Sequence, residues 1–198
     1  MDAAGDAYVA GQTQSDEATF PAMVGPDLTY NGGVSPGFTS GVGDVFVAKV
    51  DATGMALVYA GYIGGAANDG NPGFREPAIA VDTAGNAYVA GSTSSDEATF
   101  PVTVGPDLTF NGGQPCGTGC TASDAFVAKV DSTGTALVYA GYIGGERNDY
   151  GQGVAVDAAG NAYVTGYTTS DEATFPATVG PDLTFNGSQD AFVAKVDA

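Results

Sequence analysis

Three near copies of one segment constrain this chain more than any other feature of its sequence. The segment "AGNAYVAGSTSSDEATFPVTVGPDLTFNGG" covers residues 84–113, and near copies of it begin at Ala4 and Ala159. A second run, "DAFVAKVD" or "DVFVAKVD", follows each copy. Repetition on this scale indicates that one supersecondary unit has been copied along the chain and that the copies stack on one another. We therefore divide the 198 residues into three predicted units, 1–65, 66–145 and 146–198.

The middle unit contains four short runs that are rich in Val, Tyr, Phe and Ile, as strands are. They cover residues 78–82, 86–91, 125–131 and 137–143. Short loops with glycine join the first two runs and the last two, which is typical of hairpins. Alternation along the third run predicts that Phe126, Ala128 and Val130 share one face of the strand, with Val127 and Lys129 on the other.

The outer units each contain three of these four runs. The first unit lacks the leading run, and the last unit lacks the trailing one. The sequence thus predicts an all-β chain with ten strands, arranged as about two and a half tandem four-stranded antiparallel units. Segment length varies before "DAFVAKVD" and between "YIGG" and "AVD", so we expect surface loops at both places.

Four antiparallel strands per tandem unit describe a propeller blade. The order "AVDxxGNAYVxGxTxSxxxTFP" and then "DAFVAKVDxxGxALVYAGYIGG" resembles the beta-propeller repeats called SBBP, which are found in bacterial extracellular and cell-surface proteins. The resemblance covers almost the whole chain, and the extended "DEATFPxxVGPDLTxNG" connector departs from it. It implies propeller blades and an extracellular or cell-surface location.

One chain of this kind is not expected to close a propeller, because closed propellers usually have at least four blades. The incomplete outer units leave unpaired strand edges, which proteins normally cover. Three arrangements remain open. The chain is part of a longer repeat array, or copies cover one another's edges in an oligomer or filament, or the units stack as a solenoid or sandwich.

The charge balance limits the partners of the chain. There are 5 Lys and Arg against 23 Asp and Glu, and the formal net charge is −18. Such a field repels nucleic acids and anionic membranes. No apolar stretch is long enough for a membrane span, so we expect neither a nucleic-acid partner nor a spanning segment.

Acidic pairs recur at the start of each connector and are the candidate metal ligands: Asp16, Glu17, Asp96, Glu97, Asp171 and Glu172. Carboxylates are ligands that calcium prefers. The alternative is that Phe20, Phe100 and Phe175, with Leu28, Leu108 and Leu183, anchor each connector and leave the acids in solvent. Asp69 and Asp149 form a second candidate cation site, for which turn formation is the alternative.

The remaining chemistry-bearing residues favour structural roles. Lys49, Lys129 and Lys195 recur at one strand position, and we expect ion pairs with strand-end acids such as Asp82 or Asp157. The chain has no histidine, which excludes a Ser-His-Asp triad and histidine-ligated zinc. A carboxylate pair for glycoside hydrolysis stays open. We expect a disulfide between Cys116 and Cys120, and Asn186 begins a formal glycosylation sequon.

The sequence therefore predicts a non-enzymatic extracellular or cell-surface structural repeat protein. It assembles head to tail into an oligomer or filament, or forms part of a longer repeat array. The alternatives are a propeller module that binds glycans or divalent cations, with calcium as the only candidate cofactor, and a hydrolase that uses carboxylates.

Overall fold

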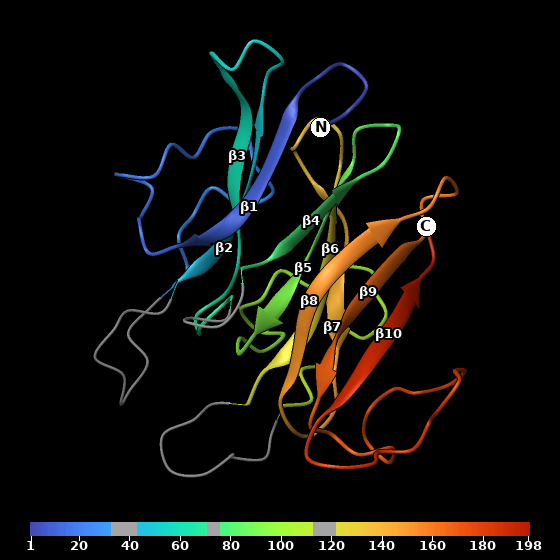
Figure 1. The fold of residues 1–198 in the computed structure, drawn as a ribbon. Helices are drawn as coiled ribbons and strands as arrows, with labels where there is room; N and C mark the ends of the chain where they lie inside the picture. Colours follow the sequence, from blue (N-terminus) through green and yellow to red (C-terminus); the bar gives the residue numbers. More distant parts are fainter. Residues whose placement is uncertain (33–42, 71–75, 113–121) are drawn as a thin grey trace.

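The computed structural model describes residues 1–32, 43–70, 76–112 and 122–198 (Figure 1). Within these ranges the chain forms ten strands, and the all-β prediction is confirmed. The described part contains no helix that is long and apolar enough to cross a membrane. The strands are β1 (Ala7–Thr13), β2 (Asp44–Val50), β3 (Leu57–Ile63), β4 (Ala78–Val81), β5 (Ala87–Thr93), β6 (Asp124–Val130), β7 (Leu137–Ile143), β8 (Asp149–Val156), β9 (Ala162–Thr168) and β10 (Asp190–Val196).

The strands form three antiparallel sheets, which correspond to the three repeats. The first sheet has the order β1-β2-β3, the second β4-β5-β6-β7, and the third β8-β9-β10. Figure 1 shows them in chain order, with the four-stranded sheet between the other two. The described strands do not close into a ring, so the structure is consistent with part of a propeller.

The core lies in two layers, one on each face of the middle sheet. Phe126, Ala128 and Val130 pack with residues of the first unit such as Val47, whereas Val127 packs with residues of the third unit such as Val164. The two-face alternation predicted along β6 is therefore confirmed. All of β5 is buried, as expected for a central strand that is covered on both faces.

Each leading hairpin turns on an aspartate and a glycine. In the middle unit Asp82 Oδ1 accepts hydrogen bonds from the backbone nitrogens of Ala84 and Asn86, at 2.9 Å each. Gly85 has φ 86°, and its counterparts Gly5 and Gly160 have φ 90° and 86°. Only glycine adopts this conformation at low cost, which explains why "AG" recurs at each turn.

Strand β8 begins earlier than the sequence suggested. We expected the segment between "YIGG" and "AVD" to be a loop, but Asp149–Gly153 belongs to the strand, with a bulge between Gly151 and Gly153. The Tyr150 ring packs on Tyr167 with centroids 4.8 Å apart, which holds this part of β8 against β9. Two glycines obscured the strand alternation that would have predicted it.

Candidate interaction sites: connectors, junctions and open faces

The phenylalanine of each "TFP" motif anchors its connector to the sheet. Phe100 is 2% exposed, and its ring centroid lies 5.2 Å from that of Phe126 and 5.5 Å from that of Tyr142. The counterparts Phe20 and Phe175 make the same kind of contact with their own sheets. The predicted leucine anchors are wrong, because the connector leucines are 42–46% exposed: Leu28, Leu108 and Leu183.

The acidic pairs shape the connectors through hydrogen bonds. Asp96 Oδ1 accepts from Ala98 N at 3.2 Å, and the Asp96 carbonyl accepts from Phe100 N at 2.8 Å. Glu97 Oε2 accepts from Phe110 N at 3.2 Å, across the connector. The counterparts make the same bonds in the outer units: Asp16, Glu17, Asp171 and Glu172. These carboxylates are therefore neither free nor arranged around a common centre.

A second aspartate closes each connector. Asp107 Oδ1 accepts from Thr109 N at 2.9 Å, and Asp107 Oδ2 accepts from Asn111 Nδ2 at 2.7 Å. Asn111 N in turn donates to Asp124 Oδ2 at 2.9 Å, which ties the connector to the first residue of β6. Within the described residues no group of three or more acids and cysteines is placed to hold a metal ion.

Buried aspartates occupy both junctions between units. Asp69 lies in the junction of the first and second units and is fully buried. Its Oδ2 accepts from Gly65 N at 2.6 Å and from Ser95 Oγ at 3.0 Å, and its Oδ1 accepts from Thr93 Oγ1. Asp149 repeats these contacts in the second junction. Both residues, predicted as turn formers or cation ligands, hold the junction through these hydrogen bonds.

Sequence analysis did not identify Asp44 and Asp124 as site residues. Both are fully buried, each begins a strand, and the Oδ1 of each has no hydrogen-bond partner among the residues that the structure describes. Burial raises the pKa of Asp44 to about 7 and that of Asp124 to about 8, and the nearby charges of Asp69 and Asp149 add to these shifts. Burial also raises the pKa of Asp69 to about 6. The sequence feature that could have identified them is the aspartate that begins the same apolar strand in every unit.

The three lysines have different partners. Lys49 forms ion pairs with Asp2 at 3.2 Å and Asp6 at 3.0 Å, and Asp2 is the first-unit counterpart of Asp82 and Asp157. Lys129 forms no ion pair with Asp82 and lies instead over the Tyr88 ring, 5.0 Å from its centroid. Lys195 pairs with Asp197 at 2.9 Å, not with Asp157. An ion pair with a strand-end acid is thus confirmed in the first and third units, although the partner in the third is Asp197.

A tyrosine links each unit to the next. Tyr8 Oη donates to the Gly85 carbonyl at 3.2 Å, and Tyr88 Oη donates to the Gly160 carbonyl at 3.1 Å. Both acceptors are the turn glycines of the following unit. The third tyrosine of the series, Tyr163, donates to Asp157 within its own unit.

The outer faces of the first and third units expose side chains that the junctions bury. We call the face of the first unit that points away from the second unit its backward face. On this face Val9 is 44% exposed, whereas its counterpart Val89 is fully buried. We call the face of the third unit that points away from the second unit its forward face. On this face Val193 is 64% exposed, whereas its counterpart Val127 is fully buried. The two open faces are therefore counterparts of the two surfaces that meet inside each junction.

A comparison with known families agrees with this repeat geometry. The model of the family described as "Beta-propeller repeat", SBBP, matches residues 77–97 and 138–172. These two segments match SBBP beta-propeller repeats. The first match spans β4 and β5, and the second runs from β7 across the second junction to β9. No curated protein matches the chain significantly.

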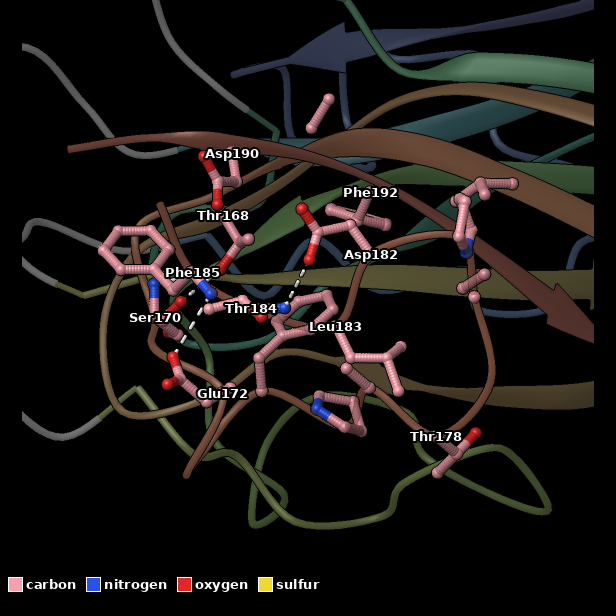
Figure 2. Close-up of a pocket in the computed structure, with 18 of the residues that line it drawn as sticks. Thr168, Ser170, Glu172, Thr178, Asp182, Leu183, Thr184, Phe185, Asp190 and Phe192 are labelled. Atoms are coloured by element: carbon pink, nitrogen blue, oxygen red, sulfur yellow. Dashed lines mark hydrogen bonds between the residues drawn. The ribbon is translucent and has the colours of Figure 1, made fainter. Parts of the chain in front are cut away.

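The third unit contains a hollow of about 560 Å³ between β10 and its connector (Figure 2). Its walls include Ser170, Phe175, Asp182, Phe185 and Phe192. Figure 2 shows the connector bent around the opening, with Asp182 bonded to Thr184 and Glu172 bonded to Phe185. In the middle unit β7 occupies the equivalent position beside β6.

Three other residues singled out in the sequence carry little further information. Cys116 and Cys120 lie outside the described residues, so their pairing stays a prediction. Asn186 lies in the third connector, and its side-chain nitrogen donates to Asp182 Oδ2 at 3.0 Å and to the Thr184 carbonyl at 2.8 Å. The asparagine thus takes part in the hydrogen bonds that shape the connector.

Proposed function

We propose that this propeller-repeat chain is a non-enzymatic structural module of an extracellular or cell-surface protein, and that copies of it assemble head to tail. The observation that carries the proposal is the exposure of Val9 and Val193 at positions that both internal junctions bury. The forward face of the third unit then packs on the backward face of the first unit in another copy.

The contacts inside the molecule define this interface. In both junctions a tyrosine of one unit donates to the turn glycine of the next. By the same arrangement, Tyr163 of one copy donates to the Gly5 carbonyl of the next copy, and Val193 packs near Val9. A contact between two different faces repeats without limit unless the rotation closes, so it gives rings or filaments.

A structural role agrees with the hydrogen bonds that the acidic residues of the connectors accept. The connector carboxylates accept backbone hydrogen bonds, and the same arrangement occurs in all three units. A catalytic group is not needed once per repeat, whereas a shape-holding group is. The extracellular or cell-surface location is supported by the resemblance of the repeats to those of bacterial secreted and surface proteins.

Light scattering over a range of protein concentrations tests the assembly. The wild-type chain should gain mass with concentration, and Val193→Asp should stay monomeric because a charge in the apolar contact is costly to bury. Val104→Asp is the matched control, since Val104 is an exposed valine on the connector of the middle unit. A wild-type mass that stays at one chain at all concentrations would overturn the proposal.

A further inference from the structure

We infer that one proton, shared by two buried aspartates, holds each internal junction closed, and that loss of this proton as the pH rises opens the junction. The first junction pair is Asp44 and Asp69, and the second junction pair is Asp124 and Asp149. Loss of the proton leaves two negative charges in one buried site, and their repulsion separates the neighbouring units. The inference goes beyond assembly between copies, because both junctions lie inside one chain.

Backbone hydrogen bonds bring the two acids of each pair together. Asp149 N donates to the Ser123 carbonyl at 2.7 Å, and Ser123 immediately precedes Asp124. The first junction has the same arrangement, with a bond of 2.9 Å from Asp69 N to the Gly43 carbonyl. Each pair therefore consists of one acid from the start of a strand in one unit and one acid from the start of the next unit.

The two glycines of each "YIGG" motif contact the two carboxyl groups. A Cβ on Gly144 would lie 2.6 Å from Cγ and from Oδ1 of Asp124, so the unpartnered oxygen of Asp124 points at this turn. The next residue, Gly145, donates its backbone N–H to Asp149 Oδ2 at 2.7 Å. A Cβ on Gly64 would lie 2.6 Å from the equivalent carboxyl carbon of the first junction. Consecutive residues of one turn thus contact both acids of the pair.

The pairs lack a positive charge that would neutralise them. Within the described ranges the ion pairs are made by Lys49 and Lys195, and neither reaches a junction acid. Two ionised carboxylates in one fully buried site repel each other and have lost their hydration, so one of them retains a proton. A proton needs no space of its own, which suits the close packing of Asp124 against Gly144.

The other titratable groups around the second junction pair do not take over the proton. Burial raises the pKa of Asp124 to about 8, and the charges of Asp149 and of Asp107 in the connector add to this shift. Tyr142 of β7 also faces the site, and burial raises its pKa, so it stays neutral while the acids titrate. Two further charged residues of the turn are exposed to solvent: Glu146 and Arg147. The groups that face the first junction pair are Asp27, Tyr30, Tyr62 and Tyr142.

Repulsion within the pair acts on a bond that crosses the junction. Asp149 Oδ2 accepts from Ser170 Oγ of the third unit at 2.9 Å and from Gly145 N of the second unit. Asp149 therefore links the two units, and an ionised Asp124 pushes it away from the second unit. The Gly145 bond is the one that opening breaks. Because the raised pKa of Asp124 lies near 8, the junction is closed below this pH and opens above it.

Carbon-13 NMR of the aspartate carboxyl groups in the intact 198-residue chain tests the shared proton. Between pH 4 and 10, Asp124 and Asp149 should titrate in two coupled steps, the upper one near pH 8. In Asp149→Asn the like charge is gone, so the titration of Asp124 should move down by at least about half a pH unit. Glu146→Gln removes an exposed acid from the same turn and should leave both steps in place.

The reciprocal variant Asp124→Asn keeps the test decisive if Asp149→Asn does not fold. In this variant the titration of Asp149 should move down for the same reason. An Asp124 titration that is the same in wild type and Asp149→Asn, or an Asp149 titration that is the same in wild type and Asp124→Asn, would overturn the shared proton.

Amide hydrogen exchange tests the opening of the junction. Between pH 7 and 9 the Gly145 amide should lose at least about tenfold of its protection, after correction for the intrinsic exchange rate, because its bond crosses the junction. The Val127 amide lies inside the middle sheet and is the matched control, which should change less than about twofold. Asp124→Asn cannot ionise, so it should keep the Gly145 amide protected at pH 9. Equal losses at Gly145 and Val127, or a loss at Gly145 that persists in Asp124→Asn, would show that the proton does not hold the junction.

Discussion

Asp124 should make the stability of the chain fall as pH rises from 5 to 7. Its carboxyl group is fully buried, one of its oxygens has no hydrogen-bond partner within the described parts of the chain, and burial raises its pKa to about 8. In the unfolded chain an aspartate loses its proton near pH 4. Between these values the folded state therefore binds one more proton than the unfolded state, so a rise in pH favours unfolding.

The magnitude follows from one proton. One bound proton changes the free energy of unfolding by about 1.4 kcal/mol per pH unit, so Asp124 alone should lower it by about 2 to 3 kcal/mol between pH 5 and 7. For a chain of this length that is a fall in melting temperature of roughly 5 to 10 °C. The equivalent residue Asp44, with its pKa raised to about 7, adds to the effect over the lower part of the range.

Chemical denaturation at pH 5, 6 and 7 measures this dependence. The variant Asp124→Asn cannot ionise, so its free energy of unfolding should fall less steeply, by about 1.4 kcal/mol per pH unit relative to wild type. Glu146→Gln removes an exposed acid from the same junction and should keep the wild-type slope. A stability that is flat or rises from pH 5 to 7, or equal slopes in wild type and Asp124→Asn, would refute this assignment.

Three further predictions concern the connectors and the first unit. Phe100→Ala should lower the free energy of unfolding by about 3 to 5 kcal/mol, because it leaves a cavity beside Phe126, whereas Leu108→Ala on the exposed side should cost less than about 1 kcal/mol by denaturant titration. A chelator or millimolar calcium should leave the melting temperature unchanged, because the connector acids already bind backbone nitrogens; a fall with chelator would restore a metal site. Asp6→Asn introduces the residue found at this position in the other two units, where Asn86 and Asn161 donate to Asp82 and Asp157. The melting temperature should therefore change by no more than about 3 °C in calorimetry. A larger loss would show that the first unit depends on the Lys49 to Asp6 ion pair.

The repeat was sufficient to predict the strands and their grouping. Hairpin spacing and two-residue alternation placed the four strands of the middle unit to within a few residues, and β6 has the two apolar faces expected of it. The exception is β8, where Gly151 and Gly153 interrupt the alternation and a bulge absorbs the extra residue. Alternation of apolar and polar side chains predicts a strand poorly where glycines, which have no side chain, occupy several of its positions.

The candidate site was less accessible to sequence reasoning because it depends on which units meet. The connector acids were recognised, but their role became visible only with the distance from Glu97 to Phe110, two residues thirteen positions apart. Asp44 and Asp124 are enclosed by distant parts of their own units, such as Asn31 and Asn111, and no local pattern reports that. The different partners of Lys49 and Lys129 follow from one substitution, Asp6 against Asn86, whose effect depends on the fold.

Mixing two variants tests head-to-tail assembly most directly. Val9→Asp places a charge on the backward face of the first unit and leaves the forward face of the third unit unchanged. Val193→Asp places a charge on the forward face and leaves the backward face unchanged. Each variant alone should be monomeric by sedimentation velocity, and an equimolar mixture should form a complex of two chains and nothing larger, because only one intact pair of faces remains. A mixture that stays monomeric, or single variants that assemble as well as the wild type, would contradict assembly through these two faces.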